Sequence, residues 1–374
     1  MAESELQHLR DRLLRAFARG EDMDAAAFEA LALDVFRAQF EHNPVYRAYC
    51  TRRDRMPGTV RGWLDVPAVP TAAFREVRLL TPLAEREPDA VFRTSGTTRG
   101  RERRGEHVVP DLSLYRASLL PTFDHFVLPD GARPTLLSLV PSPPEQPDSS
   151  LSFMIGEVVR QRGNGESGWF VSVADGLDAA RLLAALRLAE ASDAPVALLG
   201  TTLAFDRLLE AMEADDVRVR LPERSRLMDT GGPKGAGREV SPATMSQRYA
   251  DRLGIAPDWQ VNEYGMTELC SQFYDGRIRA ATGAEPQGAA RLRKAGPPWL
   301  RSTAVDPATL EPLPTGEPGI LRHHDLANLG SVAAVQTEDL GRVHEDGTIE
   351  LLGRLPGAQP RGCSIALDLM LGRG

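Results

Sequence analysis

The sequence predicts an α/β protein with parallel or mixed sheets covered by helices, and a small antiparallel β unit towards its end. Through the middle of the chain, short continuously apolar runs alternate with longer helical patterns, as buried parallel strands and their helices do. After about residue 300, prolines and glycines become frequent and separate short strand-like runs. The length of 374 residues and the hydrophobic content of 42% suffice for two or three modest domains.

Helical patterns open the chain. Residues 3–19 place four leucines and a phenylalanine on one face, and Gly20 can end that helix. Asp24 can cap a second helix, and a proline-led helical turn follows at residues 43–50. Two prolines within the apolar stretch 66–70 predict an extended segment held against a core.

The central alternation predicts the main sheet. The expected buried strands are residues 135–140, 170–173, 196–200 and 226–230. The expected helices are residues 111–126, 151–162, 177–191, 204–214 and 241–253. In such sheets, ligands bind beyond the carboxyl ends of the strands.

Composition excludes several classes of protein. A net charge of −8 argues against a partner that is nucleic acid or an acidic membrane surface. Three widely separated cysteines suggest neither a disulfide framework nor a zinc site. The acidic N-terminus is unlike a secretory signal, and no apolar run has the length of a membrane span. We therefore expect a cytoplasmic protein.

The stretch 94–100 is the first candidate for binding a ligand. Its hydroxyls and glycines, Ser95, Gly96, Thr97, Thr98 and Gly100, follow a short β-type run. Small residues let an anion approach backbone amides, and hydroxyls donate to phosphate oxygens. The arginines 101, 103 and 104 add charge that suits a polyphosphate. The alternative interpretation is a polar surface hairpin.

Three later segments have related chemistry. A strand at 226–230 runs into Gly231-Gly232-Pro233-Lys234-Gly235, where glycines allow backbone to lie against a planar ligand. Residues 261–268 combine an aromatic face, a hydroxyl and carboxylates able to bind Mg²⁺. Residues 337–342 place an acid at a turn, and Gly353-Arg354 ends the last strand. The alternative interpretation is a helix N-terminus with a turn for residues 226–235, and a polar strand-to-helix turn for residues 261–268.

These four segments, in this order, resemble the adenylate-forming (ANL) superfamily of acyl-CoA synthetases and their relatives. Within it, residues 43–46, 66–70 and 231–235 look like the acyl-protein synthetase family of bacterial bioluminescence (LuxE type). Phenylacetate-CoA ligases are the next most similar group. The resemblance implies the large α/β domain of that superfamily, with ATP and Mg²⁺ as cofactors and a carboxylic acid, typically fatty, as substrate.

The resemblance also implies roles for individual residues. Ser95, Gly96, Thr97, Thr98 and Gly100 would hold the β- and γ-phosphates of ATP. Gly231 and Gly232 would flank the adenine, and Tyr264, followed by Gly265, would stack on it. Thr267 would contact the α-phosphate, Glu268 would bind Mg²⁺, Asp339 would accept from the ribose hydroxyls, and Arg354 would support the ribose or mark a hinge.

The C-terminal region departs from the superfamily pattern. Members carry a further C-terminal lid domain with a lysine that assists adenylation, whereas this chain ends 20 residues after Arg354 and its last lysine is Lys294. The lid is thus expected to be largely absent. Lys234 or the arginines near Arg101 would then take over the role of that lysine, or activity would be slow or lost.

Cys363 is the candidate nucleophile. The resembled family passes its acyl group to a cysteine in such a C-terminal position. Cys363 lies between glycine and serine in a basic stretch, and a neighbouring arginine can lower the pKa of a thiol. A thiolate can attack the carbonyl of an acyl-AMP. The alternative interpretation is an inert packing residue, as we expect for Cys50 and Cys270.

The predicted function is therefore activation of a carboxylic acid to acyl-AMP, followed by transfer to Cys363 and to a protein partner. Two alternatives stay open: a CoA- or amide-forming ligase, and a nucleotide-binding protein that has lost activity. The predicted segments are an N-terminal helical region (1–80), an α/β core (81–300), an antiparallel β unit (301–354) and a tail with the cysteine (355–374).

Overall fold

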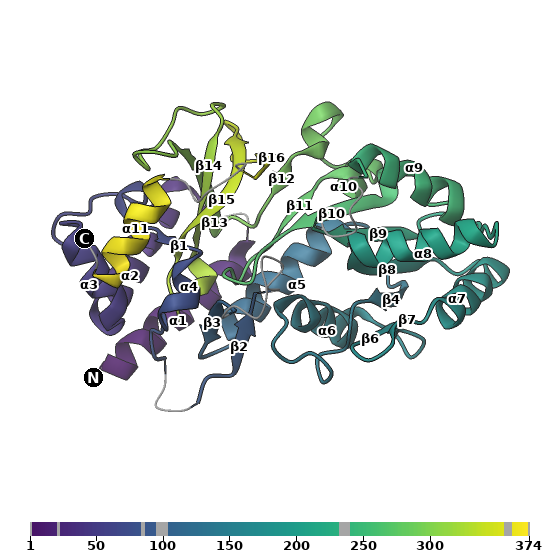
Figure 1. Cartoon of the computed structure of the whole chain (residues 1–374), viewed down its shortest axis with the longest axis horizontal. Helices are drawn as coiled ribbons and strands as arrows, with labels where there is room; N and C mark the ends of the chain where they lie inside the picture. Colours follow the sequence, from purple (N-terminus) through teal and green to yellow (C-terminus); the bar gives the residue numbers. More distant parts are fainter. Residues whose placement is uncertain are drawn as a thin grey trace. The chain divides into compact units, whose positions relative to one another are not determined.

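The computed structural model describes residues 2–20, 23–83, 87–94, 104–231, 240–354 and 361–372. The chain forms two compact units, each built from segments far apart in the sequence (Figure 1). Unit 1 comprises Met1–Leu119, Met266–Gln272 and Ala295–Gly374, and unit 2 comprises Leu120–Gly265 and Phe273–Lys294. The four predicted consecutive segments divide the chain differently, and they stay a prediction.

Unit 2 contains the predicted parallel sheet. Neighbouring strands follow the order β5-β4-β8-β9-β10-β11, and all are parallel except β11. Their bounds are β4 Thr135–Leu139, β5 Gly168–Trp169, β8 Val196–Thr201, β9 Arg226–Thr230, β10 Gln260–Tyr264 and β11 Phe273–Asp275. The continuously apolar runs predicted from the sequence are confirmed as buried strands β4 and β8, and the strand predicted to run into the glycine-rich turn is confirmed as β9.

Helices cover this sheet. One apolar core joins alternate residues of β4, β8 and β9 to α7 (Ala179–Ser192), α8 (Thr202–Ala214) and α9 (Pro242–Leu253). Elsewhere in unit 2, Phe126 stacks on Tyr274 of β11 with ring centroids 5.5 Å apart, and Met154 of α6 (Ser150–Arg162) lies against the same tyrosine. The predicted α/β class is confirmed.

One predicted strand is corrected. Residues 170–173 were expected in the parallel sheet, but Val171–Ser172 (β6) pairs antiparallel with Gly176–Leu177 (β7) in a separate hairpin. The neighbouring β5 occupies the sheet edge instead. A run of four residues is too short for its pattern to separate these two outcomes.

Unit 1 contains the predicted antiparallel β unit. Strands β13 (Leu300–Val305), β14 (Gly319–Asp325), β15 (Ala334–Val343) and β16 (Ile349–Arg354) pair in sequence order, all antiparallel. The short β1 (Val69–Pro70) adds to β15 in parallel. The proline-containing stretch 66–70 is therefore held against this sheet, as expected.

Helices surround that β unit. They are α1 (Ala2–Arg19), α2 (Ala25–His42), α3 (Pro44–Arg52), α4 (Ala73–Glu76) and α11 (Arg361–Leu371), and α5 (Ser113–Val127) begins in this unit. Asp24 caps α2 by accepting from the amide of Ala27 at 2.8 Å, as predicted. Phe17 of α1 stacks on Trp299 with ring centroids 4.3 Å apart. The helix α11 packs against α3, α4 and β1.

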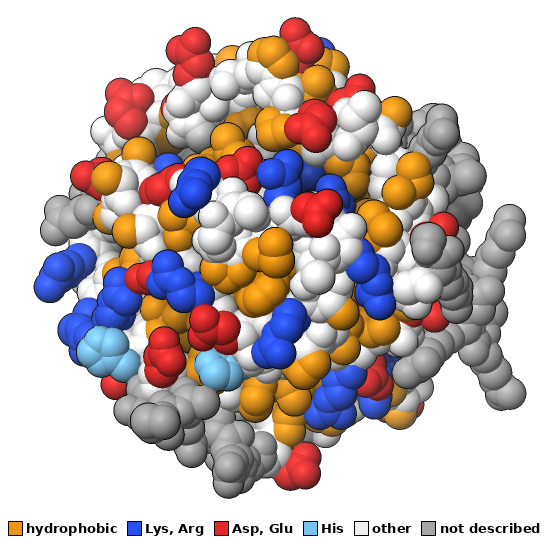
Figure 2. Space-filling model, turned by 90° about the vertical axis from the view of Figure 1, so that its left-hand side faces the viewer, with side chains coloured by type: hydrophobic (Ala, Val, Ile, Leu, Met, Phe, Trp, Pro, Cys, Tyr) orange, Lys and Arg blue, Asp and Glu red, His pale blue; other side chains and the backbone are white. Residues whose placement is uncertain are grey.

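The remaining elements are short. A two-stranded hairpin of β2 (Ala90–Arg93) and β3 (Glu106–Val109) belongs to unit 1. The others are η2 Trp63–Asp65, η3 Pro257–Trp259, α10 Arg277–Ala281, η4 Gly288–Leu292, β12 Lys294–Ala295 and η5 Leu326–Asn328. Basic, acidic and apolar side chains are interspersed on the face shown in Figure 2. Among the helices of the described residues, none is long and apolar enough to cross a membrane.

Candidate active site

Part of the predicted site lies outside the described residues. This applies to Ser95, Gly96, Thr97, Thr98, Gly100, Arg101, Gly232 and Lys234. The structure describes what precedes and follows the first motif: strand β2 before it and strand β3 after it. Arg93 and Glu106 face each other in that hairpin and form an ion pair at 3.0 Å. The predicted phosphate-binding stretch therefore connects two paired strands of unit 1.

Glu268 is a buried carboxylate in unit 1. Its side chain is only 6% exposed, and burial raises its pKa to about 7. The charges of Arg75 and Arg354 act in the opposite direction, whereas Asp339 adds to the increase. Within the described part of unit 1, the Glu268 carboxylate forms no ion pair. It is therefore held in a low-dielectric environment, and none of the described residues of unit 1 provides a directly bonded cation.

Asp339 and Arg354 lie together in the same unit. They occupy facing positions of β15 and β16, and the Arg354 guanidinium donates to the Asp339 carboxylate at 2.9 Å. Asp339 is partly buried, while the Arg354 side chain is 60% exposed. Because both influence the pKa of Glu268, three of the predicted residues are neighbours in unit 1.

Cys363 differs from the expectation of a reactive turn. It lies in helix α11, is 1% exposed, and packs with Val305, Leu310 and Ile320. Burial raises the pKa of its thiol to about 11, and the nearby Glu338 adds to that increase. The predicted low pKa is therefore wrong for this conformation, because burial outweighs the effect of positive charge. Its Sγ lies 3.9 Å from the carbonyl oxygen of Thr337, two residues before Asp339.

His107 and Asn328 are neighbours of Thr267 and Glu268 that sequence reasoning missed. His107 Nδ1 lies 2.7 Å from the carbonyl oxygen of Thr267. Asn328 donates from Nδ2 to the carbonyl of Glu268 at 2.9 Å. No sequence signal joins positions 107, 267 and 328, because only the fold brings them together.

Unit 2 holds the predicted adenine-binding residues. Gly231 follows β9 with a φ of +83°, a backbone conformation that favours glycine. Tyr264 ends the neighbouring β10, and its ring packs on Phe273 with centroids 5.7 Å apart. Since Thr230 pairs with Glu263 in parallel register, Gly231, Tyr264 and Gly265 come at the same edge of the sheet.

A second buried glutamate lies beside them. Glu263 is 4% exposed and accepts a hydrogen bond from the hydroxyl of Thr230. Burial raises its pKa to about 7, although Thr230 and the charge of Lys294 partly oppose the increase. Unlike Glu268, this carboxylate has a bonded partner within its own unit.

Glu263 borders a buried polar network in unit 2. Lys294 donates to the carbonyl of Asn262 at 2.6 Å and lies 3.4 Å from the Asp275 carboxylate. Asp229 accepts from Asn262 at 2.7 Å and from the Tyr249 hydroxyl at 3.1 Å. The last lysine of the chain is therefore engaged in holding β9, β10 and β11 together.

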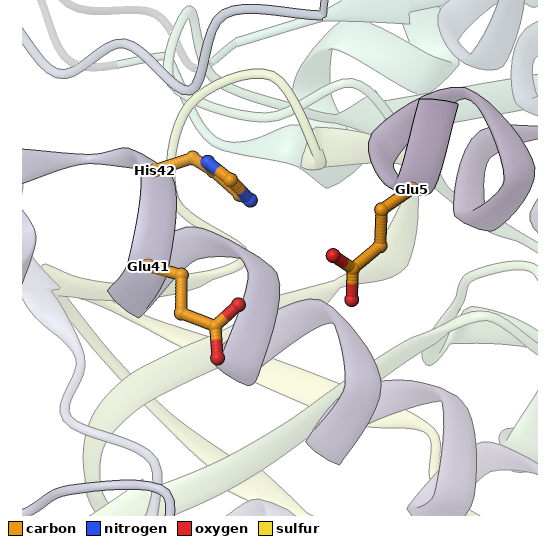
Figure 3. Close-up of side chains that lie close together, drawn as sticks. All are labelled: Glu5, Glu41 and His42. Atoms are coloured by element: carbon orange, nitrogen blue, oxygen red, sulfur yellow. The ribbon is translucent and has the colours of Figure 1, made fainter. Parts of the chain in front are cut away.

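The residues of unit 1 fit a divalent cation. Carboxylate oxygen is the ligand type that Mg²⁺ prefers, and Glu268 offers one that is buried and lacks a bonded cation among the described residues. A bound cation would also favour the charged form of this carboxylate. A separate group of Glu5, Glu41 and His42 lies close together on α1 and α2 (Figure 3). Glu5 and Glu41 are exposed, and such surface groups are common without an ion.

Unit 2 also contains an open cavity of about 830 Å³. Its walls include Trp259, Arg279 and His125. None of the described predicted site residues lines it.

The fold is that of the adenylate-forming ligases. A solved 2-hydroxyisobutyryl-CoA ligase in an open conformation with 2-HIB-AMP and CoA aligns with a TM-score of 0.64 at 17% identity, covering 91% of this chain and 78% of that one. The same ligase in a postadenylation state, in complex with 2-HIB-AMP, aligns with a TM-score of 0.64, and the alignment covers 89% of this chain and 69% of that one. Because the sequence identity is only 17%, the structural similarity to this ligase is evidence for the fold alone.

The sequence narrows this class to one family. The family described as acyl-protein synthetase, LuxE, matches residues 164–371, so this chain belongs to that family and is an enzyme of the ligase class. Two long-chain-fatty-acid–luciferin-component ligases are each 22% identical. The one from Aliivibrio fischeri covers 91% of this chain and 87% of its own, and the one from Vibrio harveyi covers 90% and 86%.

Proposed function

We propose that this protein uses ATP and Mg²⁺ to activate a fatty acid as acyl-AMP, and that the acyl group then passes to Cys363 and to a protein partner. Membership of the acyl-protein synthetase family supports the first part. The observation that carries the proposal is the grouping of Glu268 with Asp339 and Arg354 in unit 1. A metal-binding carboxylate and a ribose-binding acid are both required near one nucleotide.

In the first step, the carboxylate oxygen of the acid bonds to the α-phosphorus of ATP while the bond to pyrophosphate breaks. The bound metal ion supplies neutralisation of phosphate charge. Glu268 would hold that ion, Thr267 would contact the α-phosphate, and Asp339 would accept from the ribose hydroxyls. Ser95, Gly96, Thr97, Thr98 and Gly100 would position the outer phosphates. Gly231, Gly232, Tyr264 and Gly265 would bind the adenine, with Arg354 on the ribose and Lys234 or Arg101 compensating charge.

In the second step, the sulfur of Cys363 bonds to the acyl carbon and AMP leaves, with the thiol proton passing to solvent. The thiol in the observed conformation is 1% exposed with a pKa of about 11. This step therefore requires α11 to leave its position against β1 and α3. In the transfer to the partner, a nucleophilic side chain of the partner would bond to the acyl carbon while the carbon–sulfur bond breaks, and Cys363 would be released as a thiol.

The test is ATP–pyrophosphate exchange over a panel of carboxylic acids, combined with intact-mass analysis. We expect exchange that needs both acid and Mg²⁺, and an acyl adduct released by hydroxylamine. Cys363→Ala should keep the exchange and lose the adduct. Absence of exchange with every acid, despite ATP binding, would favour a protein that binds nucleotide without activating acids.

The burial of Cys363 favours a second candidate, a ligase that passes the acyl group to CoA or to an amine. Such an enzyme would not need a reactive cysteine, so Cys363→Ala would leave product formation unchanged. Acyl-CoA formed in the presence of CoA, without any acylated protein, would select this candidate over acyl transfer to Cys363.

A further inference from the structure

We propose that His107 and Asn328 are positioning residues that hold the backbone of Thr267 and Glu268 in the orientation needed to bind Mg·ATP. The inference rests on the proposed function, since it concerns the same site. All four residues belong to unit 1, and the contacts that join them are all within that unit. Neither His107 nor Asn328 is required to touch the nucleotide.

His107 forms the first link. It lies on β3, opposite Phe92 of β2, and is 1% exposed. Its Nδ1 lies 2.7 Å from the carbonyl oxygen of Thr267, a contact that places a proton on Nδ1 because a carbonyl can only accept. Its Nε2 lies 2.8 Å from Asn328 Oδ1, which also only accepts, so both contacts are hydrogen bonds when both ring nitrogens carry a proton. Burial lowers the pKa of His107, whereas these two contacts oppose that decrease. The ring therefore spans from the hairpin to both other components of the network.

Asn328 forms the second link. It ends η5, is 1% exposed, and donates from Nδ2 to the carbonyl of Glu268 at 2.9 Å. Its own backbone is fixed by the buried Gln39 of α2, whose side-chain amide donates to the Asn328 carbonyl at 2.9 Å. The neighbouring Asp325 accepts from the amide of Cys270 and from the hydroxyl of Ser271. The segment 267–271 is thus anchored at almost every residue.

The two links act on consecutive peptide groups. Holding the carbonyls of Thr267 and Glu268 fixes the planes of the peptides that follow them, and so limits where both side chains point. His107 also connects this segment to the hairpin whose two strands flank the predicted phosphate-binding stretch. One imidazole therefore joins the two predicted phosphate- and metal-binding segments of unit 1.

Packing alone gives a poor reason for this arrangement. Replacing both members of a buried polar pair by apolar groups is often close to neutral for stability. A buried histidine that reaches the Thr267 carbonyl and a buried asparagine that reaches the Glu268 carbonyl instead specify the geometry of this backbone. Partners that orient metal ligands typically affect metal affinity by about 10- to 100-fold.

The experiment measures Mg·ATP binding to the full chain by calorimetry, and the Mg²⁺ concentration that half-saturates pyrophosphate exchange. His107→Leu should raise the dissociation constant of Mg·ATP and the half-saturating Mg²⁺ concentration by about tenfold or more. His107→Asn should recover most of the loss, because its amide can donate where Nδ1–H does. His107→Gln, whose amide reaches instead towards Asn328, should recover less.

His324→Leu is the matched control. His324 is also buried in unit 1, packs edge-on against Trp63, and its Nε2 has no hydrogen-bond partner among the described residues. The His324→Leu variant should have the same dissociation constant for Mg·ATP as the wild type. A His107→Leu protein that does the same would overturn the proposal. If His107→Leu does not fold, the other two variants decide the question. The proposal would then be overturned if His107→Asn, His107→Gln and the wild type all need the same Mg²⁺ concentration for half-saturation. A wild type that binds no nucleotide would instead refute the proposed function.

Discussion

Glu263 and Glu268 flank the same short motif, yet their surroundings differ. Both are almost fully buried, and burial raises the pKa of each to about 7. In unit 2, Glu263 accepts from Thr230 and lies near the charge of Lys294. In unit 1, the charges of Arg75 and Arg354 oppose the increase for Glu268, and no ion pair joins its carboxylate to another of the described residues. The difference agrees with a structural role for Glu263 and with the proposed role of Glu268 in holding Mg²⁺.

The largest expected effect concerns the network behind Glu263. Lys294→Met removes the nearer cation of the Asp275 carboxylate, which is 1% exposed, and leaves the Arg277 guanidinium at 3.8 Å, although Met approximates the length of the side chain. Removing one member of a buried ion pair typically costs about 3–5 kcal/mol. We expect a loss of that size in the free energy of unfolding, measured with denaturant at pH 8. A loss below about 1 kcal/mol, the size expected of an exposed pair, would show that Lys294 does not support unit 2.

Glu268→Gln tests the other half of the comparison. The substitution keeps the shape and removes the charge, so pyrophosphate exchange should fall by about 100-fold or more, with a higher Mg²⁺ requirement. Glu263→Gln is the matched control and should change exchange by less than about tenfold, since it touches no predicted ligand group. Equal losses in the two variants would remove the distinction between the two carboxylates.

The pH dependence of stability should sharpen the same contrast. The pKa of Glu263 is higher in the folded than in the unfolded chain, so the folded state binds more protons between pH 4.5 and 7. Its contribution to stability is therefore complete below pH 4.5 and is lost as the pH rises to about 7. Glu263→Gln removes this loss.

The measurement is the difference in unfolding free energy between wild type and Glu263→Gln at pH 5 and pH 8. We expect the variant to gain about 2 kcal/mol relative to wild type on going to pH 8. Comparing the two proteins at each pH cancels the opposite effect of the buried histidines, whose pKa values are lowered. An unchanged difference would mean that Glu263 is charged at both pH values.

The smallest expected effect is at the exposed edge of the candidate site. Arg354→Ala breaks the ion pair with Asp339, but the Arg354 side chain is 60% exposed. Such pairs contribute about 0–1 kcal/mol, so the melting temperature should hardly change. If Arg354 supports the ribose, the KM for ATP should nevertheless rise. Unchanged stability together with an unchanged KM would leave Arg354 without a role in nucleotide binding.

Regular patterns made much of the fold predictable. The apolar runs that became β4 and β8 cannot lie in solvent, and the turn residues after position 300 separate the strands of the antiparallel unit. Residues 170–173 failed as a sheet strand because four residues give too little periodicity.

The sequence by itself determined the class of fold, the order of the candidate motifs and the family resemblance, because these depend on local patterns of residue type. Tertiary structure decided which polar groups meet. It buried Cys363 in α11 and raised its pKa, joined His107 and Asn328 to the Thr267–Glu268 backbone, and gave Glu263 a hydrogen bond from Thr230. Burial and contacts between residues far apart in sequence set these properties, and no local pattern encodes them.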